Sequence, residues 1–368
     1  HRISARLRLA AGGGCLDDTH RSADFPKVSR CTLMPVIPHS SYPGPPAYLR
    51  NGHLQTVVPS VFRKVKGVDY ERERLELPDG DFLDLDWLDS RSKRLLIVTH
   101  GLEGDSHRHY VKGTAKLFSA AGWDVLAWNC RSCSGEMNRA FRLYNHGEIG
   151  DLTTVVHHTL RTKSYQQLAF VGFSMGGNIT LKYLGTAEDA LPDVVSGAAV
   201  FSSPTDLHGS VELLDQPVNR FYKKRFLKKL SHKIRQKAAQ FPNKLDLQKL
   251  QEVREWRQFD EAFSAPLGGY RDANDFYTQG SAKNYLPTIT VPTLLVNALN
   301  DPLLSPSCHP YALAEGHRYL HLETPAQVGH VGFLVPKDEF TWAERRALAF
   351  LDSPPFSPNL RGSDLTPM

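Results

Sequence analysis

The sequence is poor in cysteine and lacks any long apolar run. Five cysteines in 368 residues are too few and too scattered to form a disulfide framework. No apolar run approaches the roughly 18 residues that a membrane-spanning helix needs. The net charge of +5 is modest for this length and does not by itself indicate nucleic-acid binding. These shortages argue against a disulfide-stapled scaffold, a membrane-spanning protein and a nucleic-acid-binding protein, and they favour a globular protein of the cytoplasm.

Cys130 and Cys133 have the CxxC spacing that is typical of redox and zinc sites. No second CxxC pair accompanies them, and their surroundings do not resemble a thioredoxin-like motif. We interpret them as reduced thiols in a loop. The sequence accordingly predicts neither a metal nor an organic cofactor.

Both ends of the chain differ in composition from its middle. Residues 1–33 have no usable periodicity and carry six Lys or Arg against three Asp, so we interpret them as a vector- or upstream-derived leader. Met34 would then be the natural start. A secretory signal is the alternative, but arginines interrupt an apolar stretch that is too short for one. Residues 353–368 are rich in Pro and Ser, which predicts a flexible tail.

Short apolar segments alternate with helical patterns in residues 34–204 and 288–352. This alternation predicts an α/β fold with a mostly parallel sheet and helices on both faces. The expected strands are Arg74–Leu77, Phe82–Trp87, Leu95–Thr99, Asp124–Trp128, Leu168–Val171, Val195–Phe201, Thr293–Asn297 and Tyr319–Leu322. The expected helices include Tyr110–Ala121, Ile149–Thr162 and Lys337–Leu351.

Residues 205–287 interrupt this alternation after the sixth expected strand. They are polar and helical in pattern, so we expect a cap or lid over the carboxyl ends of the strands. Within them Arg220–Gln240 is strongly basic and has an apolar stripe at helical spacing, formed by Phe226, Leu230 and Ile234. We favour a cap helix whose stripe packs on the body, whose cations face solvent and whose charge is partly neutralised by acidic residues of 245–263. The alternative is a weak contact with an anionic membrane surface.

The stretch Gly172–Gly176 reads Gly-Phe-Ser-Met-Gly and lies between an expected strand and a helical pattern. In such a strand–turn–helix the turn is so tight that side chains two residues from the serine would collide, which explains the two glycines. The pattern predicts a nucleophile elbow with Ser174 at its apex.

A serine hydroxyl is a poor nucleophile unless a base takes its proton, and a histidine held by an acid is the usual base. After this type of elbow the acid comes next along the chain and the histidine last. Asp301 follows the expected strand Thr293–Asn297, and His330 lies in a glycine-flanked loop after the last strand. We therefore predict a triad of Ser174, Asp301 and His330, with Asp206 as the alternative acid.

The tetrahedral intermediate of such a reaction needs hydrogen-bond donors for its oxyanion. We expect the backbone N–H of Met175, next to the nucleophile, to be one of them. The second should come from the loop after Leu95–Thr99, from the N–H of Leu102. His100 would brace that loop and take no part in proton transfer.

At this point the chain resembles the α/β-hydrolase superfamily and, within it, the YheT-like (EMB8-like) esterases. The resemblance covers about Met34 to Leu351. It implies a hydrolase of carboxylic esters with Ser174, Asp301 and His330 as its triad. Val328 and Ser132 depart from the family pattern in ways that affect loop shape only. The motifs that carry the resemblance are Asn51–Thr56, His100–Gly104, Asn129–Asn138, Gly172–Asn178, Asn297–Pro302 and Gly329–Phe333.

The sequence thus predicts a serine carboxylesterase that hydrolyses short- to medium-chain esters of small molecules through an acyl-enzyme. The alternatives are an acyltransferase or a lipase or phospholipase with the same triad, and a catalytically silent binding protein. The first motif of the resemblance, Asn51–Thr56, is expected to anchor the N-terminal segment. Aromatic residues near the cap are expected to supply the acyl pocket: Phe201, Phe259, Phe263, Tyr270, Phe276 and Tyr277.

Overall fold

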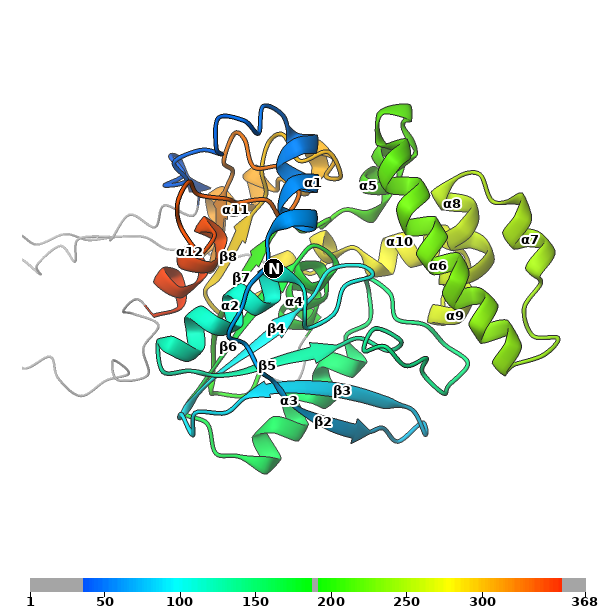
Figure 1. Cartoon of the computed structure of the whole chain (residues 1–368), viewed down its shortest axis with the longest axis horizontal. Coiled ribbons are helices and arrows are strands. Elements are labelled where there is room, and N and C mark those ends of the chain that lie inside the picture. The colour runs from blue at the N-terminus through cyan, green and yellow to red at the C-terminus, as the bar shows by residue number, and fades with distance from the viewer. Residues whose placement is uncertain (1–35, 187–190, 353–368) are drawn as a thin grey trace, which may run out of the picture. The chain divides into compact units, whose positions relative to one another are not determined.

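A nine-stranded, mostly parallel sheet forms the centre of the protein (Figure 1). This computed structural model describes residues 36–186 and 191–352, all within one unit, Met34–Met368. The leader and tail expected at 1–33 and 353–368 lie outside the described residues. The strand order is β1-β9-β8-β7-β6-β4-β5-β3-β2, with β3 antiparallel to both of its neighbours. The strands are β1 (Val36–Ile37), β2 (Glu71–Glu76), β3 (Phe82–Leu88), β4 (Arg94–Thr99), β5 (Asp124–Asn129), β6 (Gln167–Phe173), β7 (Val195–Phe201), β8 (Thr293–Val296) and β9 (Leu320–Glu323).

Helices connect these strands and fill the long segment between β7 and β8. The α-helices are α1 (Gly52–Phe62), α2 (His109–Ala120), α3 (Gly150–Thr162), α4 (Met175–Thr186), α5 (Leu207–Asp215), α6 (Arg220–Gln240), α7 (Leu247–Glu252), α8 (Trp256–Phe259), α9 (Ala265–Gly268), α10 (Ala273–Gly280), α11 (Tyr311–Gly316) and α12 (Trp342–Leu351). The short 3₁₀ and π segments are η1 (Pro217–Asn219), η2 (Asp260–Ser264), η3 (Ala282–Asn284), η4 (Leu286–Thr288) and η5 (Pro306–Cys308).

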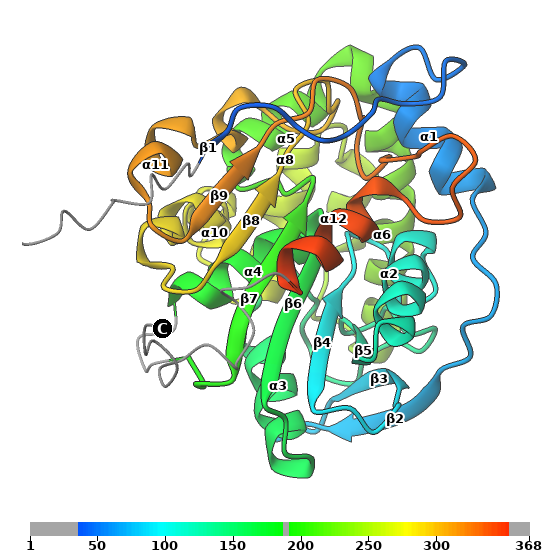
Figure 2. The same ribbon diagram turned by 90° about the vertical axis from the view of Figure 1, so that its left-hand side faces the viewer.

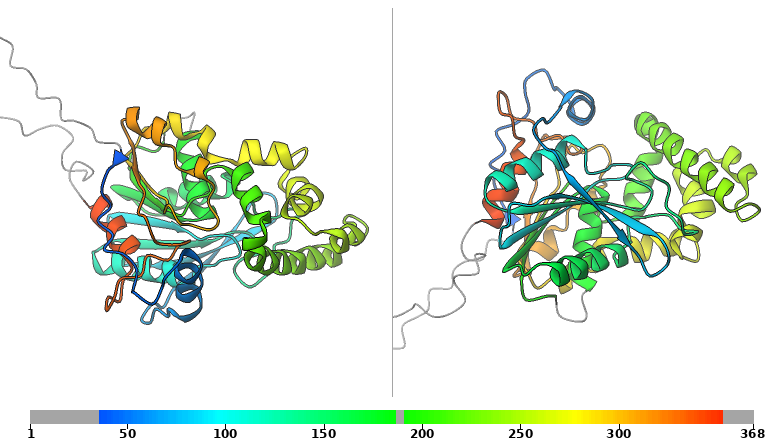
Figure 3. Two further views of the ribbon diagram at one scale, coloured as in Figure 1. Left: turned by 90° about the horizontal axis from the view of Figure 1, so that it is seen from above. Right: turned by 60° about the horizontal axis from the view of Figure 1, so that its bottom comes forward.

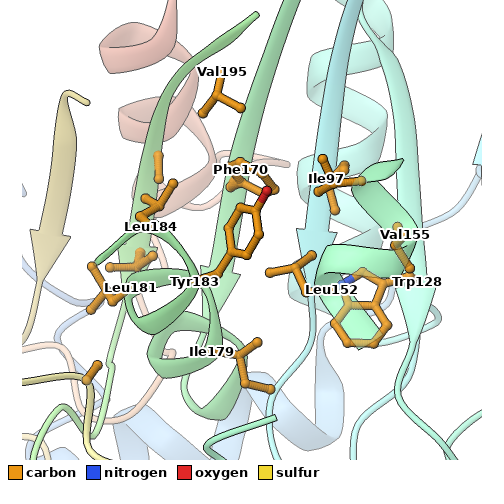
Figure 4. Packing of buried hydrophobic residues seen from close by; sticks show 14 of the residues in the cluster. Ile97, Trp128, Leu152, Val155, Phe170, Ile179, Leu181, Tyr183, Leu184 and Val195 are labelled. Atoms are coloured by element: carbon orange, nitrogen blue, oxygen red, sulfur yellow. The ribbon is translucent and has the colours of Figure 1, made fainter. Parts of the chain in front are cut away.

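Helices cover both faces of the sheet, as the alternating pattern predicts (Figures 2 and 3). One core lies between the strands and α3 and α4, and the other between the strands and α2 and α12. The central strands β5 and β6 are buried along their whole length, which is why they read as continuous apolar runs. Figure 4 shows the first core, in which side chains of α3 and α4 meet those of the strands: Leu152, Val155, Ile179, Tyr183, Ile97 and Phe170.

The sequence misses the strand β1 and misplaces the starts of β2, expected at Arg74 and observed at Glu71, and of the last helix. The two-residue strand β1 pairs with β9 and is too short to give an alternating pattern. The last helix begins at Trp342, so the expected start at Lys337 is wrong. Thr341 caps this helix: its hydroxyl accepts the N–H of Glu344, whose carboxylate accepts the N–H of Thr341.

Helices α5 to α10 occupy residues 205–287 and build a core of their own, at the right of Figure 1. On α6, Leu230 and Ile234 are buried and Phe226 is half-buried in this core. Leu143 and Leu303, which lie outside the cap, join the same core, so the expected apolar stripe packs between the other cap helices and the body. None of the helices in the described ranges combines the length and apolar composition that crossing a bilayer requires.

The charges of α6 do not all face solvent, so this part of the expectation is wrong. Lys237 is fully buried and donates to the carbonyl oxygens of Asn138 and Ala140 at 2.7 and 2.9 Å, and burial lowers its pKa to about 8. Lys233 also faces the body, where it pairs with Glu103.

The ion pairs of α6 within the described chain are made with residues outside 245–263. Lys233 pairs with Glu103 at 2.7 Å and Lys223 with Asp215 at 3.0 Å. The acidic residues of 245–263 instead cap helices or hold loops, as Asp246 does at the start of α7. The expectation that residues 245–263 partly neutralise the charge of α6 is therefore wrong. Their carboxylates bind groups of the cap helices and loops instead.

Candidate active site

Ser174 stands on the turn between β6 and α4, at the carboxyl end of the sheet. Its φ of +54° lies in the left-handed region, which is costly for a residue with a side chain. The neighbouring glycines make the turn possible. A Cβ on Gly172 would lie 2.6 Å from the carbonyl oxygen of Gly176, and a Cβ on Gly176 would lie 2.2 Å from that of Thr99. The backbone therefore forms the strained elbow that the sequence predicts.

His330 lies between Ser174 and Asp301. Its Nε2 is 2.8 Å from Ser174 Oγ, and its Nδ1 is 2.8 Å and 3.1 Å from the two carboxylate oxygens of Asp301. The Asp301 side chain is fully buried, whereas the His330 side chain is 12 % exposed. With Nδ1–H donating to the carboxylate, Nε2 is left to accept the serine proton. The arrangement can therefore activate a hydroxyl for attack on a carbonyl carbon.

Asp206, the alternative acid, lies just before α5 and is engaged elsewhere. Its carboxylate pairs with Lys283 at 2.9 Å, and its pKa is lowered although burial alone would raise it. The lowering comes mainly from the hydrogen bond with Lys283. The structure thus brings Asp301, and not Asp206, to the histidine.

The Asn51–Thr56 motif holds the histidine loop. Asn51 caps α1 by accepting the N–H of Leu54, and this places Thr56 on the first turn and a half of the helix. The hydroxyl of Thr56 accepts the backbone N–H of His330 at 2.8 Å. On the other side, the hydroxyl of Ser202 accepts the N–H of Val331 at 2.9 Å. The backbone around the imidazole is therefore held by two hydroxyl groups.

The same motif also reaches the loop that carries Asp301. Gln55 accepts a hydrogen bond from the side-chain amide of Asn300 at 2.8 Å, and the side-chain oxygen of Asn300 accepts the N–H groups of Val328 and Gly329. The start of α1 also lies very close to the loop of Asn300. A Cβ added to Gly52 would lie 2.3 Å from the backbone carbonyl oxygen of Asn300, so only glycine fits there. Sequence reasoning expected an anchor for the N-terminal segment and missed that this anchor holds the loops of both Asp301 and His330.

The two amides expected to stabilise an oxyanion lie beside Ser174. Met175 opens α4, so its N–H has no partner within the helix. Leu102 follows Gly101, where an added Cβ would lie only 3.1 Å from Ser174 Cβ. Among the described residues neither amide has a hydrogen-bond acceptor. Both are therefore free to donate to a substrate.

His100 braces the loop that carries Leu102. Its Nδ1–H donates to the carbonyl of Gly101 at 2.8 Å, and its Nε2 accepts the N–H of Cys130 at 3.1 Å. Complete burial lowers the pKa of His100 to about 4, so the ring is neutral at physiological pH. This agrees with the bracing role expected for it.

Two pockets meet at Ser174 and His330. The first, which we call the histidine-side pocket, includes Thr56 and Val331, which flank His330. The second, which we call the cap pocket, lies under the insertion and is mainly apolar. The two share Leu102, Phe226, Leu303, Ser174 and His330. The apolar side chains of the cap pocket include Leu207, Val211, Leu214, Trp256, Phe276 and Tyr277.

The aromatic lining of the cap pocket is only partly the expected one. Phe276 and Tyr277 line it, together with Phe226 and Trp256, which were not expected. Three of the other expected rings belong to the protein core. Phe201 packs on the sheet between Phe173 and Phe333, and Phe259 and Phe263 belong to the core of the cap. Tyr270 packs against Phe276 behind the pocket wall.

Two polar groups line the cap pocket, the buried Asp260 and the half-buried His146. Burial raises the pKa of Asp260 to about 7, and its carboxylate accepts the hydroxyl of Tyr277 at 2.8 Å. Burial lowers the pKa of His146 to about 4, so this ring is neutral. Near pH 7 the His146 ring is neutral and Asp260 is about half protonated, so the only charge that these two groups bring to the pocket is that of a partly ionised carboxyl group.

The CxxC pair is buried and its thiols are free. Cys130 and Cys133 are unpaired, and burial raises the pKa of both thiols. Within 36–186 and 191–352, no group of His, Cys, Asp and Glu side chains could hold a metal ion.

Known proteins resemble this chain in sequence and in fold. The profile of the α/β hydrolase fold family matches residues 94–336. A putative esterase, YheT of Escherichia coli, is 36 % identical over 77 % of this chain and 84 % of its own length. Phospholipase ABHD3 of Mus musculus is 27 % identical over 82 % of this chain and 74 % of its own length. The esterase Pf2001 of Pyrococcus furiosus superposes with a TM-score of 0.53 at 17 % identity, over 85 % of this chain and 98 % of that one.

Proposed function

Because the chain belongs to the α/β-hydrolase fold family and to its YheT-like group, we propose that it is a serine carboxylesterase with Ser174, Asp301 and His330 as its catalytic triad. The observation that carries the proposal is the continuous chain of short contacts from Ser174 Oγ through the imidazole to the buried carboxylate. One alternative, an acyltransferase, is favoured by a relative of Saccharomyces cerevisiae, 27 % identical over 70 % of this chain, that is named a medium-chain fatty acid ethyl ester synthase/esterase. The other, a silent binding protein, has no observation of its own in its favour.

The proposed reaction has two halves. Ser174 Oγ attacks the ester carbonyl while His330 Nε2 takes its proton, and the N–H groups of Leu102 and Met175 receive the developing oxyanion. The carbon–oxygen bond to the alcohol then breaks, and the imidazolium gives its proton to the departing alcohol. In the second half His330 activates water, which releases the acid and restores the serine.

Asp301 keeps the imidazole in the tautomer that this reaction needs and stabilises the imidazolium. The cap pocket is proposed to hold the acyl chain, since apolar side chains surround it and it opens at Ser174. We place the reaction in the cytoplasm, in keeping with three buried cysteines that are free thiols, Cys130, Cys133 and Cys308.

A phospholipase is the second candidate. The mouse relative is named as one, and basic side chains of α6 line the histidine-side pocket. The two candidates share the triad and differ in the alcohol that leaves, so they are separated by substrate and not by active-site substitutions.

An acyl-chain series tests the proposal. p-Nitrophenyl esters from acetate to laurate should be hydrolysed with a maximum at short to medium chains, because side chains of α5, α8 and α10 line the cap pocket and limit the room for the acyl chain. Val211→Phe, which fills that pocket, should move the maximum to shorter chains by reducing kcat/KM for octanoate at least about tenfold relative to acetate. A profile that the substitution leaves unchanged would place the acyl chain elsewhere.

Thr56→Val should lower kcat about tenfold, with a smaller change in KM. The substitution keeps the side-chain shape but removes the acceptor for the His330 N–H, so the imidazole loses part of its support. Stopped-flow or steady-state assays with p-nitrophenyl acetate measure it. Thr56→Ser restores the hydroxyl and should recover most of the rate. Equal losses in both variants would mean that packing, and not this hydrogen bond, matters.

A further inference from the structure

The histidine-side pocket is lined by three cations: Arg108 from the loop before α2, and Arg225 and Lys229 from α6. Within the described part of the chain none of the three forms an ion pair with a carboxylate. Arg225 is exposed and Lys229 is half-buried. An apolar ester would gain nothing from these charges, and holding like charges together costs free energy.

The acidic residue of this pocket, Glu103, cannot neutralise them. Its carboxylate accepts the hydroxyl of Tyr144 at 2.6 Å and pairs with Lys233 at 2.7 Å. Lys233 lies outside the lining of the pocket. The carboxylate is therefore already balanced, and the positive charge of the other three side chains remains.

Two of the cations converge on one atom. Arg108 Nη2 and Lys229 Nζ donate to the carbonyl oxygen of Glu103 at 2.6 and 3.3 Å. Glu103 directly follows Leu102, so both charges lie beside the proposed oxyanion amide. Burial and repulsion from Arg108 lower the pKa of Lys229, the attraction of Glu103 opposes them in part, and repulsion from Arg225 lowers it further, so that the pKa as a whole is lowered. An anion bound between these groups would relieve that repulsion.

The proposed reaction leaves the histidine-side pocket for the alcohol half of the ester, because the cap pocket is proposed to hold the acyl chain. His330 must hand its proton to the departing oxygen, and Thr56 and Val331, which flank His330, line this pocket and not the cap pocket. The apolar cap pocket remains for the acyl chain. The charges therefore meet the alcohol half of the ester.

From this arrangement we infer that the substrate is an ester whose alcohol half carries a phosphate group, which Arg108, Arg225 and Lys229 bind in the histidine-side pocket. Guanidinium and ammonium groups are the usual partners of phosphate oxygens. The inference rests on the proposed function, since it names the alcohol that Ser174 and His330 release. Hydrolysis consumes one water and yields the carboxylic acid and the phosphorylated alcohol.

Two matched esters test it: 1-hexanoylglycerol 3-phosphate and 1-hexanoylglycerol, both used as monomers in solution. They share the acyl chain and the scissile bond and differ only in the phosphate. Release of hexanoate should show kcat/KM at least about tenfold higher for the phosphorylated ester. Equal values, or a preference for the neutral ester, would overturn the inference and leave the esterase proposal standing. Hydrolysis of neither these esters nor any p-nitrophenyl ester would instead refute the esterase proposal.

The double variant Arg225→Gln, Lys229→Gln should bring the ratio of the two kcat/KM values down to within about threefold of unity. Lys224→Gln is the matched control, because Lys224 is an exposed cation of the same helix that lines neither pocket. The control should keep the wild-type ratio. An equal drop in both proteins would show a general effect of charge and would contradict a site.

Two measurements on the unaltered protein do not depend on the folding of a variant. The preference for the phosphorylated ester should weaken as the salt concentration rises from about 0.05 to about 0.5 M, because salt screens charges that are open to solvent. Glycerol 3-phosphate should inhibit p-nitrophenyl butyrate hydrolysis competitively and more strongly than inorganic phosphate. Equal inhibition by the two would indicate a site for free phosphate and would overturn the assignment to a substrate.

Discussion

Ser174→Ala is expected to lower kcat for p-nitrophenyl butyrate by about 10⁶-fold, to the level that binding and oxyanion donors alone can supply. The loss is large because the acyl-enzyme cannot form without Oγ, and the remaining groups cannot activate water in its place. The measurement is a long steady-state assay with purified protein. A burst of p-nitrophenol, equal to the enzyme concentration in the parent and absent in the variant, would identify the acyl-enzyme directly.

The loss of activity identifies the nucleophile only if the Ser174→Ala variant is folded. The side chain of Ser174 is small, and its backbone N–H, which donates to the carbonyl of Phe201, stays in place. The thermal midpoint should therefore not fall, and alanine at φ +54° carries the same strain as serine. Ser119→Ala on α2, remote from both pockets, is the matched control and should keep full activity. Turnover above about one hundredth of the parent rate in Ser174→Ala would remove this residue from the role of nucleophile.

Asp301→Asn is expected to lower kcat about 10⁴-fold. An amide in place of the carboxylate can donate to Nδ1, which favours the tautomer with the proton on Nε2. That tautomer cannot accept the proton of Ser174. The charge that stabilises the imidazolium is lost as well, so the loss should be in kcat more than in KM.

Asp206→Asn serves as the comparison for this substitution. It removes one carboxylate charge from the pair with Lys283, outside the lining of both pockets, and should change kcat less than about tenfold. Steady-state kinetics on both variants show which substitution lowers kcat more, and thermal melting checks that both variants are folded. If Asp206→Asn were the more damaging of the two, Asp206 and not Asp301 would be the acid in solution.

Much of the fold can be read along the chain because its signals are local. Strands buried on both faces are apolar along most of their length. The predicted ends of β5, β6 and β7 therefore lie within two residues of the observed ones. The two-residue β1 has no such signal. The start of α12 depends on the reciprocal bonds of Thr341 and Glu344, which only a folded backbone can form.

The cap was harder to predict, because its helices pack on one another and not on a repeating sheet. The rotation of each helix about its axis decides which side chains reach the pocket. Phe226 and Trp256 turn toward it, while Phe259 and Phe263 turn into the core of the cap. Periodicity shows that such a helix has an apolar face, but it does not say what that face meets.

The residues Ser174, Asp301 and His330 could be proposed from order alone, since the elbow needs glycines and the acid and base follow successive strands. The sequence already placed Asp301 ahead of Asp206, although both follow strands, and the structure supports that order because only Asp301 lies beside the imidazole. The supporting bonds of Thr56 to His330 and Gln55 to Asn300 span 274 and 245 residues of chain. Local pattern carries no record of such contacts. The α/β-hydrolase fold and the proposed triad could therefore be read from the amino-acid order, whereas the support of that triad and the positive charge of the histidine-side pocket depend on packing.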